Sequence, residues 1–318
     1  MSFISQCTAD VVLRAAKALK DGHLVAFPTE TVYGLGADAT NSEAVARIYS
    51  VKGRPTDHPL IVHIADMQDM DKWAIDIPEY AIKLAREFWP GPMTLVLKRS
   101  ELAKDFITGG QDTVGVRVPN QPIALALLEE FKNIGGAGVA APSANRFGAV
   151  SPTTAKAVDE ELIDYLKEED LILDGGPSKV GVESTIIDCS GEAPRLLRLG
   201  AITSDQIDLL VGHLDKSITK NLIRVPGSLE SHYSPRAKVL MNVIPSPGQG
   251  LIAMADTETS PGVIRIASPK DINEFAQKLY SALRECDHLG LSEVVVVPPQ
   301  GDGLAEAIRD RIIRSSNR

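Results

Sequence analysis

The 318-residue chain is 44% hydrophobic and 24% charged, an ordinary globular composition that excludes disordered, collagen-like and disulfide-scaffold proteins. This length exceeds what one hydrophobic core usually organises, so two compact units are expected. The formal net charge is −9, and all of the excess lies in residues 1–235, because residues 236–318 hold ten Lys and Arg and ten Asp and Glu. Such a chain is a poor candidate for broad, nonspecific binding to nucleic-acid phosphates, although it can contain a local cationic pocket.

Hydropathy and cysteine usage indicate where the protein works. No apolar run approaches the ~20 residues that a membrane helix needs. The first twenty residues also lack a charged region followed by a continuous apolar segment, as a signal peptide would have. Cys7, Cys189 and Cys286 are odd in number and far apart, which is typical of buried thiols in a reducing compartment. We therefore expect a soluble, cytoplasmic protein with no membrane partner.

The first two hundred residues alternate between strand and helix patterns. Thr8 can cap a first helix, because apolar residues from Val11 to Leu19 recur at helical spacing. Further helices are expected at 42–53, 78–88, 122–131 and 155–166. Strands are expected at 23–28, 59–64, 94–99, 113–119, 136–143, 170–176 and 184–190, and residues 29–36 are expected to form a loop. This alternation predicts an α/β sheet, in which ligand sites commonly lie at strand ends.

The remainder of the chain predicts a second, smaller unit. A short helix is expected at 200–215, and residues 216–237 lose periodicity while gathering Pro, Gly and Ser, as a linker does. Beyond it, strands are expected at 238–244, 250–256, 262–268 and 293–299, with helices at 271–286 and 303–314. The predicted organisation is a catalytic domain at 1–215, a linker at 216–237 and an α/β domain at 238–318.

Two motifs near the N-terminus offer groups that suit an anion. FPTETVYGLG, residues 27–36, combines small hydroxyls with two glycines, although glycine-rich turns are common and the P-loop spacing is missing. In KGRPTDHPL, residues 52–60, Gly53 and Pro55 restrict the backbone beside Lys52 and Arg54, whose charges could converge on phosphate. A solvated basic turn is the alternative, and the residues alone leave both readings open.

Later segments add polar residues at element ends. In the loop APSANRFGAVSPT, residues 141–153, Ser143 and Asn145 suit hydrogen bonds to sugar and phosphate. Arg117 and His63 alternate with apolar residues of strands that look buried, so each needs a structural partner or a ligand. The alternatives are a buried ion pair for Arg117 and a satisfied core histidine for His63.

No motif for nucleophilic catalysis or metal binding is present. The GxSxG elbow, HEXXH and CxxC patterns are all missing from the sequence. Cys189 and Cys286 have no cationic residue beside them that would activate a thiol. Any metal is therefore expected to be Mg²⁺ that enters with a nucleotide.

Seven segments occur in a characteristic order: PTETVYGLG, KGRPTDHPL, WPGPMTLVL, TVGVRVP, APSAN, GVESTIID and RLLRLGAI. As an ordered set they resemble the YrdC-like family of L-threonylcarbamoyladenylate synthases. HYSP at 232–235, followed by the second unit, resembles the long two-domain form of this family. The resemblance implies a YrdC-like twisted mixed sheet with helices and a concave cationic pocket, followed by a smaller Rossmann-like α/β domain.

The resemblance also implies roles for individual residues. The family's Lys-x-Arg and Ser-x-Asn signature, whose residues are expected to be catalytic, corresponds to Lys52, Arg54, Ser143 and Asn145. L-Threonine would be held by Thr31, His63, Arg117, the backbone of Ala141, and Ser184, with Arg117 addressing its carboxylate. ATP would be held by Lys52, Arg54, His58, Thr113, Ser143, Ser151, Arg198 and Tyr233. Two positions depart from the family pattern, which commonly has Asn at His58 and a small polar residue at Phe147.

The implied reaction joins L-threonine, bicarbonate and ATP into threonylcarbamoyl-AMP and pyrophosphate, with Mg²⁺ accompanying ATP. A downstream threonylcarbamoyl transferase complex would pass the product to an adenosine next to the tRNA anticodon, so tRNA is expected to bind this chain only indirectly or weakly. Replacing Lys52 or Arg54 with Ala is expected to slow adenylation while the fold stays intact, and Tyr233 is expected to lie on a lid.

Two other functions compete with this interpretation. The first is a tRNA or double-stranded RNA binding module without catalysis, against which the acidic net charge argues. The second is a related carbamoyl-transfer domain, which we would expect within a longer chain that carries zinc-type cysteine motifs. Those motifs do not occur in this sequence.

Overall fold

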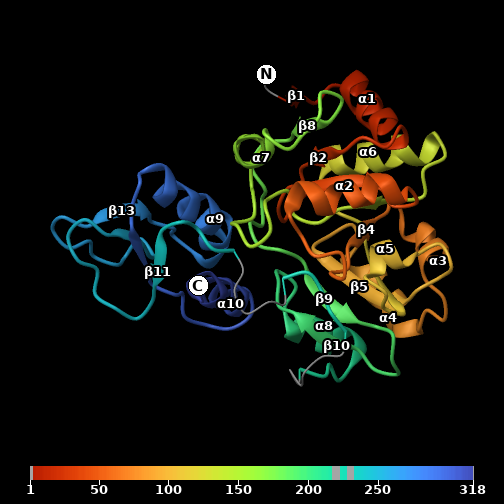
Figure 1. Cartoon of the computed structure of the whole chain (residues 1–318). Helices are drawn as coiled ribbons and strands as arrows, with labels where there is room; N and C mark the ends of the chain where they lie inside the picture. The colour runs from red at the N-terminus through yellow and green to blue at the C-terminus, as the bar shows by residue number, and fades with distance from the viewer. Residues whose placement is uncertain (1–2, 217–222, 228–232, 318) are drawn as a thin grey trace.

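The computed structural model describes residues 3–216, 223–227 and 233–317. Within these ranges the chain forms two α/β units, one built on a ten-stranded sheet and one on a four-stranded sheet (Figure 1). The expected α/β class, with a large mixed sheet and a second small sheet, is therefore confirmed. Parts of the expected linker, at 217–222 and 228–232, lie outside the described residues, as does the His232 of the HYSP motif.

The large sheet is mixed. Its strands pair in parallel at four junctions, such as β4 with β6, and antiparallel at others, such as β5 with β6. In spatial order they are β1 (Ile4–Gln6), β8 (Leu171–Asp174), β2 (Val25–Phe27), β3 (Gly34–Asp38), β7 (Val139–Ala140), β4 (Ile61–His63), β6 (Thr113–Arg117), β5 (Met93–Lys98), β9 (Thr185–Asp188) and β10 (Arg195–Arg198).

Helices cover both faces of this sheet. They are α1 (Ala9–Lys20), α2 (Ser42–Lys52), α3 (Met70–Trp73), α4 (Glu79–Phe88), α5 (Asp105–Thr108), α6 (Pro122–Asn133), α7 (Ala155–Leu162) and α8 (Ser204–Val211). Successive side chains of a strand point to opposite faces. Val25 and Phe27 accordingly join an apolar cluster with α1 and α6, whereas Ala26 joins the cluster that contains α2 and α4.

Capping residues fix the ends of the helices that lead into the site. Thr8 accepts a hydrogen bond from the backbone of Val11 at the start of α1, as its sequence position predicts. At the other end of α2, Gly53 adopts φ +61°, a left-handed conformation that ends the helix directly after Lys52. The chain then turns so that Arg54 leaves the helix axis.

The predicted loop at 29–36 is wrong for its last three residues, which begin strand β3. The glycines there serve close packing: a Cβ on Gly36 would lie 2.7 Å from Val139 Cγ1 and 2.9 Å from Phe27 Cε1. Strands β1 and β10 were also not expected, because each is short and pairs through only one neighbour. Several expected elements are shorter than predicted, including β7, α7 and α8.

The second unit follows residue 237. Its sheet is entirely parallel, in the order β11 (Lys238–Leu240), β14 (Glu293–Val296), β12 (Gly250–Ile252) and β13 (Ile264–Ala267). Helices α9 (Ile272–His288) and α10 (Leu304–Ser316) pack with this sheet. The connections at 241–249 and 253–263 contain no helix.

The two units share one apolar cluster. Val32, Val150 and Val182 of the first unit pack with Phe275, Leu279 and Leu283 of α9. In Figure 1 the helices of the second unit, drawn in blue, lie between its own sheet and the first unit. This packing places α9 and α10 directly behind the loops that form the candidate site.

Candidate active site

Strand register gathers the candidate residues at one edge of the large sheet. The parallel pairing of β4 with β6 makes His63 and Arg117, the last residues of their strands, Cα partners. An isolated bridge between Gly34 and Ser143 brings the loop after β7 to the same edge. Ser184 immediately precedes β9, whose start also lies there.

A pocket occupies this edge. Of the predicted residues, those that line it are Thr31, Arg54, His63, Arg117, Ala141, Ser143, Ser184, Arg198 and Tyr233. The lining residues that were not predicted are Thr29, Val32, Gly34, Ile61, Pro142, Glu183, Pro226 and Gly227. Its cavity volume of about 50 Å³ has room for a few water molecules, well below the several hundred Å³ of a usual ligand site.

Three buried arginines from separate elements give the pocket its positive charge. Arg54, Arg117 and Arg198 are 7%, 4% and 8% exposed. Burial lowers the pKa of Arg54 to about 10 and also lowers that of Arg198, yet Arg54 remains a cation at pH 7. Guanidinium groups with such limited solvation favour carboxylate or phosphate oxygens that enter the pocket.

Several buried polar atoms around Arg117 have no hydrogen-bond partner among the described residues. Nη2 of Arg117 lies 2.7 Å from Oε1 of Glu30, but the two are not in hydrogen-bond geometry. Nδ1 of His63 and Nε of Arg54 are likewise unsatisfied. Unsatisfied buried groups are costly, so this cluster indicates the place where a polar ligand binds.

His63 is neutral in this setting. Burial, and then the charge of Arg117, lower its pKa to about 3. Its ring packs edge-on against Phe27, with ring centroids 5.8 Å apart. A neutral imidazole can accept a hydrogen bond from a ligand while adding no charge beside Arg117.

Lys52 and Asn145 support the pocket wall from behind. Lys52 is buried, and its Nζ donates to the backbone carbonyls of Ser143 at 2.6 Å and Asn145 at 2.5 Å. The Asn145 amide donates to the carbonyls of Arg146 and Ala149. Burial, and then the charge of Arg54, lower the pKa of Lys52 well below its usual value. The structure thus places both side chains outside the pocket lining, where they shape the loop that carries Ser143.

Three residues predicted to bind ATP also lie outside this lining. Ser151 donates to the Glu183 carboxylate at 2.8 Å. Thr113 lines a smaller neighbouring cavity together with Gln111 and Arg224. His58 packs its ring edge-on against Phe147, so the two positions that depart from the family pattern contact each other.

A described part of the linker covers the pocket. Nη1 of Arg198 donates to the carbonyl of Pro226 at 2.7 Å, and Val225 packs with Ile61 and Ile186 on the sheet. A Cβ on Gly227 would lie 2.2 Å from Oη of Tyr233, so these two linker residues are in close contact. Closure by these residues accounts for the small cavity.

Sequence reasoning missed the carboxylates of the site. Glu30 and Glu183 both lie in motifs whose hydroxyls and glycines drew attention instead. The sequence offered one indication of their burial, because each glutamate is flanked by apolar or hydroxyl residues. Thr185, the residue after Ser184, donates its hydroxyl to the carbonyl of Ile202 at 2.8 Å within the fold.

The described part of the chain contains no group of three His, Cys, Asp or Glu residues that could hold a metal ion. At the pocket, Glu30 is paired with Arg117 and Glu183 with Arg311. The residues present therefore do not fit a resident metal. Among the described residues, none of the helices is both long and apolar enough to cross a bilayer.

Comparisons with known proteins agree with this architecture. A family model described as "Telomere recombination" (Sua5, YciO, YrdC) matches residues 17–200, and one described as "Threonylcarbamoyl-AMP synthase, C-terminal domain" matches residues 202–317. The threonylcarbamoyl-AMP synthase of Pyrococcus abyssi is 40% identical across 95% of this chain and 93% of its own, and that of Bacillus subtilis is 37% identical across 96% and 92%.

A solved structure extends the similarity to the whole fold. The crystal structure of P. abyssi Sua5 complexed with L-threonine superposes with a TM-score of 0.88 and 36% sequence identity, covering 99% of this chain and 97% of that one. The chain therefore belongs to the Sua5/YciO/YrdC family, in the two-domain form that carries the threonylcarbamoyl-AMP synthase C-terminal domain.

Proposed function

We propose that the protein is a threonylcarbamoyl-AMP synthase, a nucleotidyltransferase that converts L-threonine, bicarbonate and ATP into threonylcarbamoyl-AMP, pyrophosphate and water. The observation that carries this proposal is the pocket where Arg54, Arg117 and Arg198 meet beside the unsatisfied atoms of His63 and Glu30. The names of the P. abyssi and B. subtilis relatives, and the L-threonine complex of the former, support the same reaction.

Within this pocket the substrates would divide between two groups of side chains. Arg117, whose Nη1 already donates to Thr31 Oγ1 at 3.0 Å, would bind the threonine carboxylate. Arg54 and Arg198 would face the triphosphate, with Ser143 as a further donor. Arg198 would have to exchange its bond to Pro226 for a phosphate oxygen, which requires the linker to move.

The chemistry needs placement and charge stabilisation, and no covalent enzyme intermediate. The neutral amine of threonine combines with bicarbonate to give a carbamate and water. A carbamate oxygen then attacks the α-phosphorus, and pyrophosphate leaves. Arginines that surround the phosphate oxygens favour the transition state because negative charge builds there.

Mg²⁺ would enter as its complex with ATP, bound by phosphate oxygens. The chain supplies no unpaired carboxylate for it among the described pocket residues. The residues of the pocket bind, orient and exclude water.

The product would serve tRNA modification through a separate enzyme. We propose that a threonylcarbamoyl transferase complex takes up threonylcarbamoyl-AMP and that tRNA meets this chain only indirectly or weakly. A cytoplasmic setting suits this role and agrees with the three free cysteines, Cys7, Cys189 and Cys286.

The deciding experiment supplies the full-length protein with isotopically labelled threonine, bicarbonate, ATP and Mg²⁺, and detects the mixed anhydride by mass spectrometry. We expect a product that contains both labels, together with pyrophosphate, in the absence of RNA. Each omission of one substrate should abolish it. RNA binding without pyrophosphate release would overturn the proposal in favour of a binding module.

A further inference from the structure

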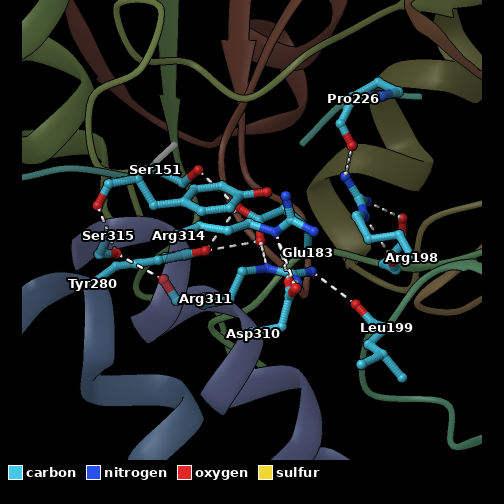
Figure 2. Close-up of polar contacts among 12 residues, drawn as sticks. Ser151, Glu183, Arg198, Leu199, Pro226, Tyr280, Asp310, Arg311, Arg314 and Ser315 are labelled. Carbon is cyan, nitrogen blue, oxygen red and sulfur yellow. Dashed lines mark hydrogen bonds and ion pairs between the residues drawn. The ribbon is translucent and has the colours of Figure 1, made fainter. Parts of the chain in front are cut away.

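A fully buried arginine of the second unit reaches the wall of the pocket. Arg311, on α10, has 0% side-chain exposure, and its Nε pairs with Oε2 of Glu183 at 2.8 Å. Glu183 itself lines the pocket next to Ser184. Figure 2 shows this ion pair, which crosses from one unit to the other, with Arg198 to its right.

Three side chains donate to the Glu183 carboxylate, and two of them come from the second unit. Oε2 accepts from Arg311 and from the hydroxyl of Tyr280 at 2.9 Å, and Oε1 accepts from Ser151 at 2.8 Å and from Tyr280 at 3.1 Å. The Tyr280 hydroxyl has one proton to share between the two oxygens, so three donors occupy most of the roughly four acceptor positions of the carboxylate. The acid is thereby held facing α9 and α10.

This arrangement determines the ionic state of Glu183. Burial alone would raise its pKa, but the charges of Arg311 and then Arg198 outweigh burial and lower it to about 2. A permanent negative charge therefore sits in the wall of a pocket that we assign to ATP phosphates. Without a partner, such a charge would repel phosphate and attract a nearby guanidinium that has no acidic partner of its own.

Arg198 carries such a guanidinium, because it lines the same pocket and its charge acts on Glu183. In this structure Arg198 donates to Ser184 through Nε and Nη2 and to Pro226 through Nη1, and none of these bonds goes to Glu183. Arg311 meanwhile also donates from Nη2 to the carbonyl of Leu199, the residue that follows Arg198. Arg311 thus satisfies the acid and fixes the backbone beside Arg198.

The same helices hold the linker residue at the pocket. The ring of Tyr233 stacks on that of Tyr280 with centroids 5.5 Å apart, and its carbonyl accepts from Ser315 Oγ at 2.9 Å. The Arg311 guanidinium lies 5.5 Å from the Tyr233 ring. Two walls of the pocket therefore depend on α9 and α10.

We propose that Arg311, assisted by Tyr280, is a positioning residue of the active site: it neutralises Glu183 and so leaves Arg198 free to bind the nucleotide. The second unit then contributes to nucleotide affinity although neither residue lines the pocket. This inference rests on the proposed function for its assignment of the pocket to ATP. It requires the positive charge of Arg311 to offset the negative charge of Glu183, and a double substitution that removes both charges can test this requirement.

The test compares Arg311→Met with the double variant Glu183→Gln/Arg311→Met in the full chain. In the single variant, Glu183 should turn to Arg198, and the Kd and KM for ATP should each rise by about tenfold or more, with a smaller change in the KM for threonine. In the double variant the charge of Glu183 is gone, and Asp310, which Arg311 also contacts, keeps its ion pair with Arg314. Most of the ATP affinity should therefore return. Arg309→Met is the matched control, because Arg309 lies on the same helix and bonds only Pro299 and Gly301 among the described residues.

The outcomes separate this proposal from a merely structural role. A double variant as weak in ATP binding as Arg311→Met, or weaker, would mean that the pair only joins the two units. Unchanged ATP affinity in a folded Arg311→Met protein would also overturn it. Should Arg311→Met fail to fold, Tyr280→Phe removes one donor from Glu183, and a several-fold loss of ATP affinity that Glu183→Gln reverses carries the same decision.

Direct measurement of ATP binding by calorimetry keeps this test distinct from that of the function. A parent protein that binds ATP without forming threonylcarbamoyl-AMP would contradict the proposed function, while the Arg311 and Glu183 comparison would remain decisive. A parent protein that binds no ATP at all would contradict both.

Discussion

Nη2 of Arg117 lies 2.7 Å from Oε1 of Glu30, with both side chains buried, yet neither atom has a hydrogen bond to another described residue. The pair is therefore close enough for strong charge attraction but lacks the geometry of a satisfied salt bridge. A substrate carboxylate that enters beside Arg117 would supply the missing hydrogen bonds. Glu30 holds the cation in place until then.

This relationship predicts the behaviour of Glu30→Gln. Removal of one partner of a buried pair should lower the free energy of unfolding of the ligand-free protein by roughly 3 kcal/mol. L-Threonine should then raise the melting temperature more in the variant than in the parent, because its carboxylate replaces the lost charge. Thermal unfolding with and without L-threonine measures this difference. L-Threoninamide, which lacks the carboxylate, is the control, and an equal gain with both compounds would contradict the prediction.

The sequence allowed much of the fold to be predicted, because hydrophobic periodicity records which faces are buried. The prediction failed at β3, where Gly34 and Gly36 resemble a turn. Gly34 instead packs closely against Ala141 and Phe27, and Gly36 against Val139 and Phe27. The backbone φ and turn preferences of a residue depend on the residue itself and its neighbours in sequence. Whether a position must be glycine to avoid a clash depends instead on residues that are distant in sequence.

The site shows the same division. Arg117 could be selected because a charge among apolar residues needs a partner, and Arg54 because its charge lies beside that of Lys52. Arg198 was implied by the family resemblance, and the structure places all three at one pocket. Glu183 could not be selected, because its partner Arg311 lies 128 residues further along the chain. The backbone carbonyls that bind Lys52 carry no side-chain identity, so no sequence pattern could show them.

Lys52 and Arg54 should therefore differ in how much their substitution lowers stability, although the fold is expected to stay intact in both variants. Lys52→Met should leave the buried carbonyls of Ser143 and Asn145 unsatisfied and lower the free energy of unfolding by about 1–3 kcal/mol, together with the rate of pyrophosphate release. Arg54→Met should lower that rate sharply with a stability change within about 1 kcal/mol. It loses one bond, from Nη2 to the Pro59 carbonyl, but it also removes a buried cation whose Nε has no bond to the described residues. Urea unfolding and pyrophosphate assays measure both quantities, and a parental unfolding midpoint for Lys52→Met would contradict the role assigned to it.

His63 should make the protein sensitive to mild acid. Its pKa is about 3 in the folded state, below the ordinary value near 6.5 that it regains on unfolding. Between these values the unfolded state binds a proton that the folded state does not, so this contribution to stability is full above pH 6.5 and is lost as pH falls toward 3. The slope from this one residue is at most about 1.4 kcal/mol per pH unit.

The measurement compares the free energy of unfolding from pH 7 to pH 5 in the parent and in His63→Gln. The variant should lose less stability over this range, since it has no buried imidazole to protonate. His213→Gln, at an exposed position, is the control and should keep the parental slope. An unchanged slope in His63→Gln would show that other groups account for the acid sensitivity.

Gly227 offers a test of the linker as a cover over the pocket. Its φ of +79° is costly for any other residue, and a Cβ there would lie 2.2 Å from Oη of Tyr233 and 3.3 Å from Nη1 of Arg198. Gly227→Ala should therefore displace Tyr233 and open the cover, so that ATP is retained several-fold less well and more threonylcarbamoyl-AMP is lost to hydrolysis. Gly212→Ala is a matched control, because Gly212 has φ +82° but nothing within 4 Å of its added Cβ. If the two variants hold ATP and protect the intermediate equally well, backbone strain alone is responsible, and residues 226, 227 and 233 do not act as a cover.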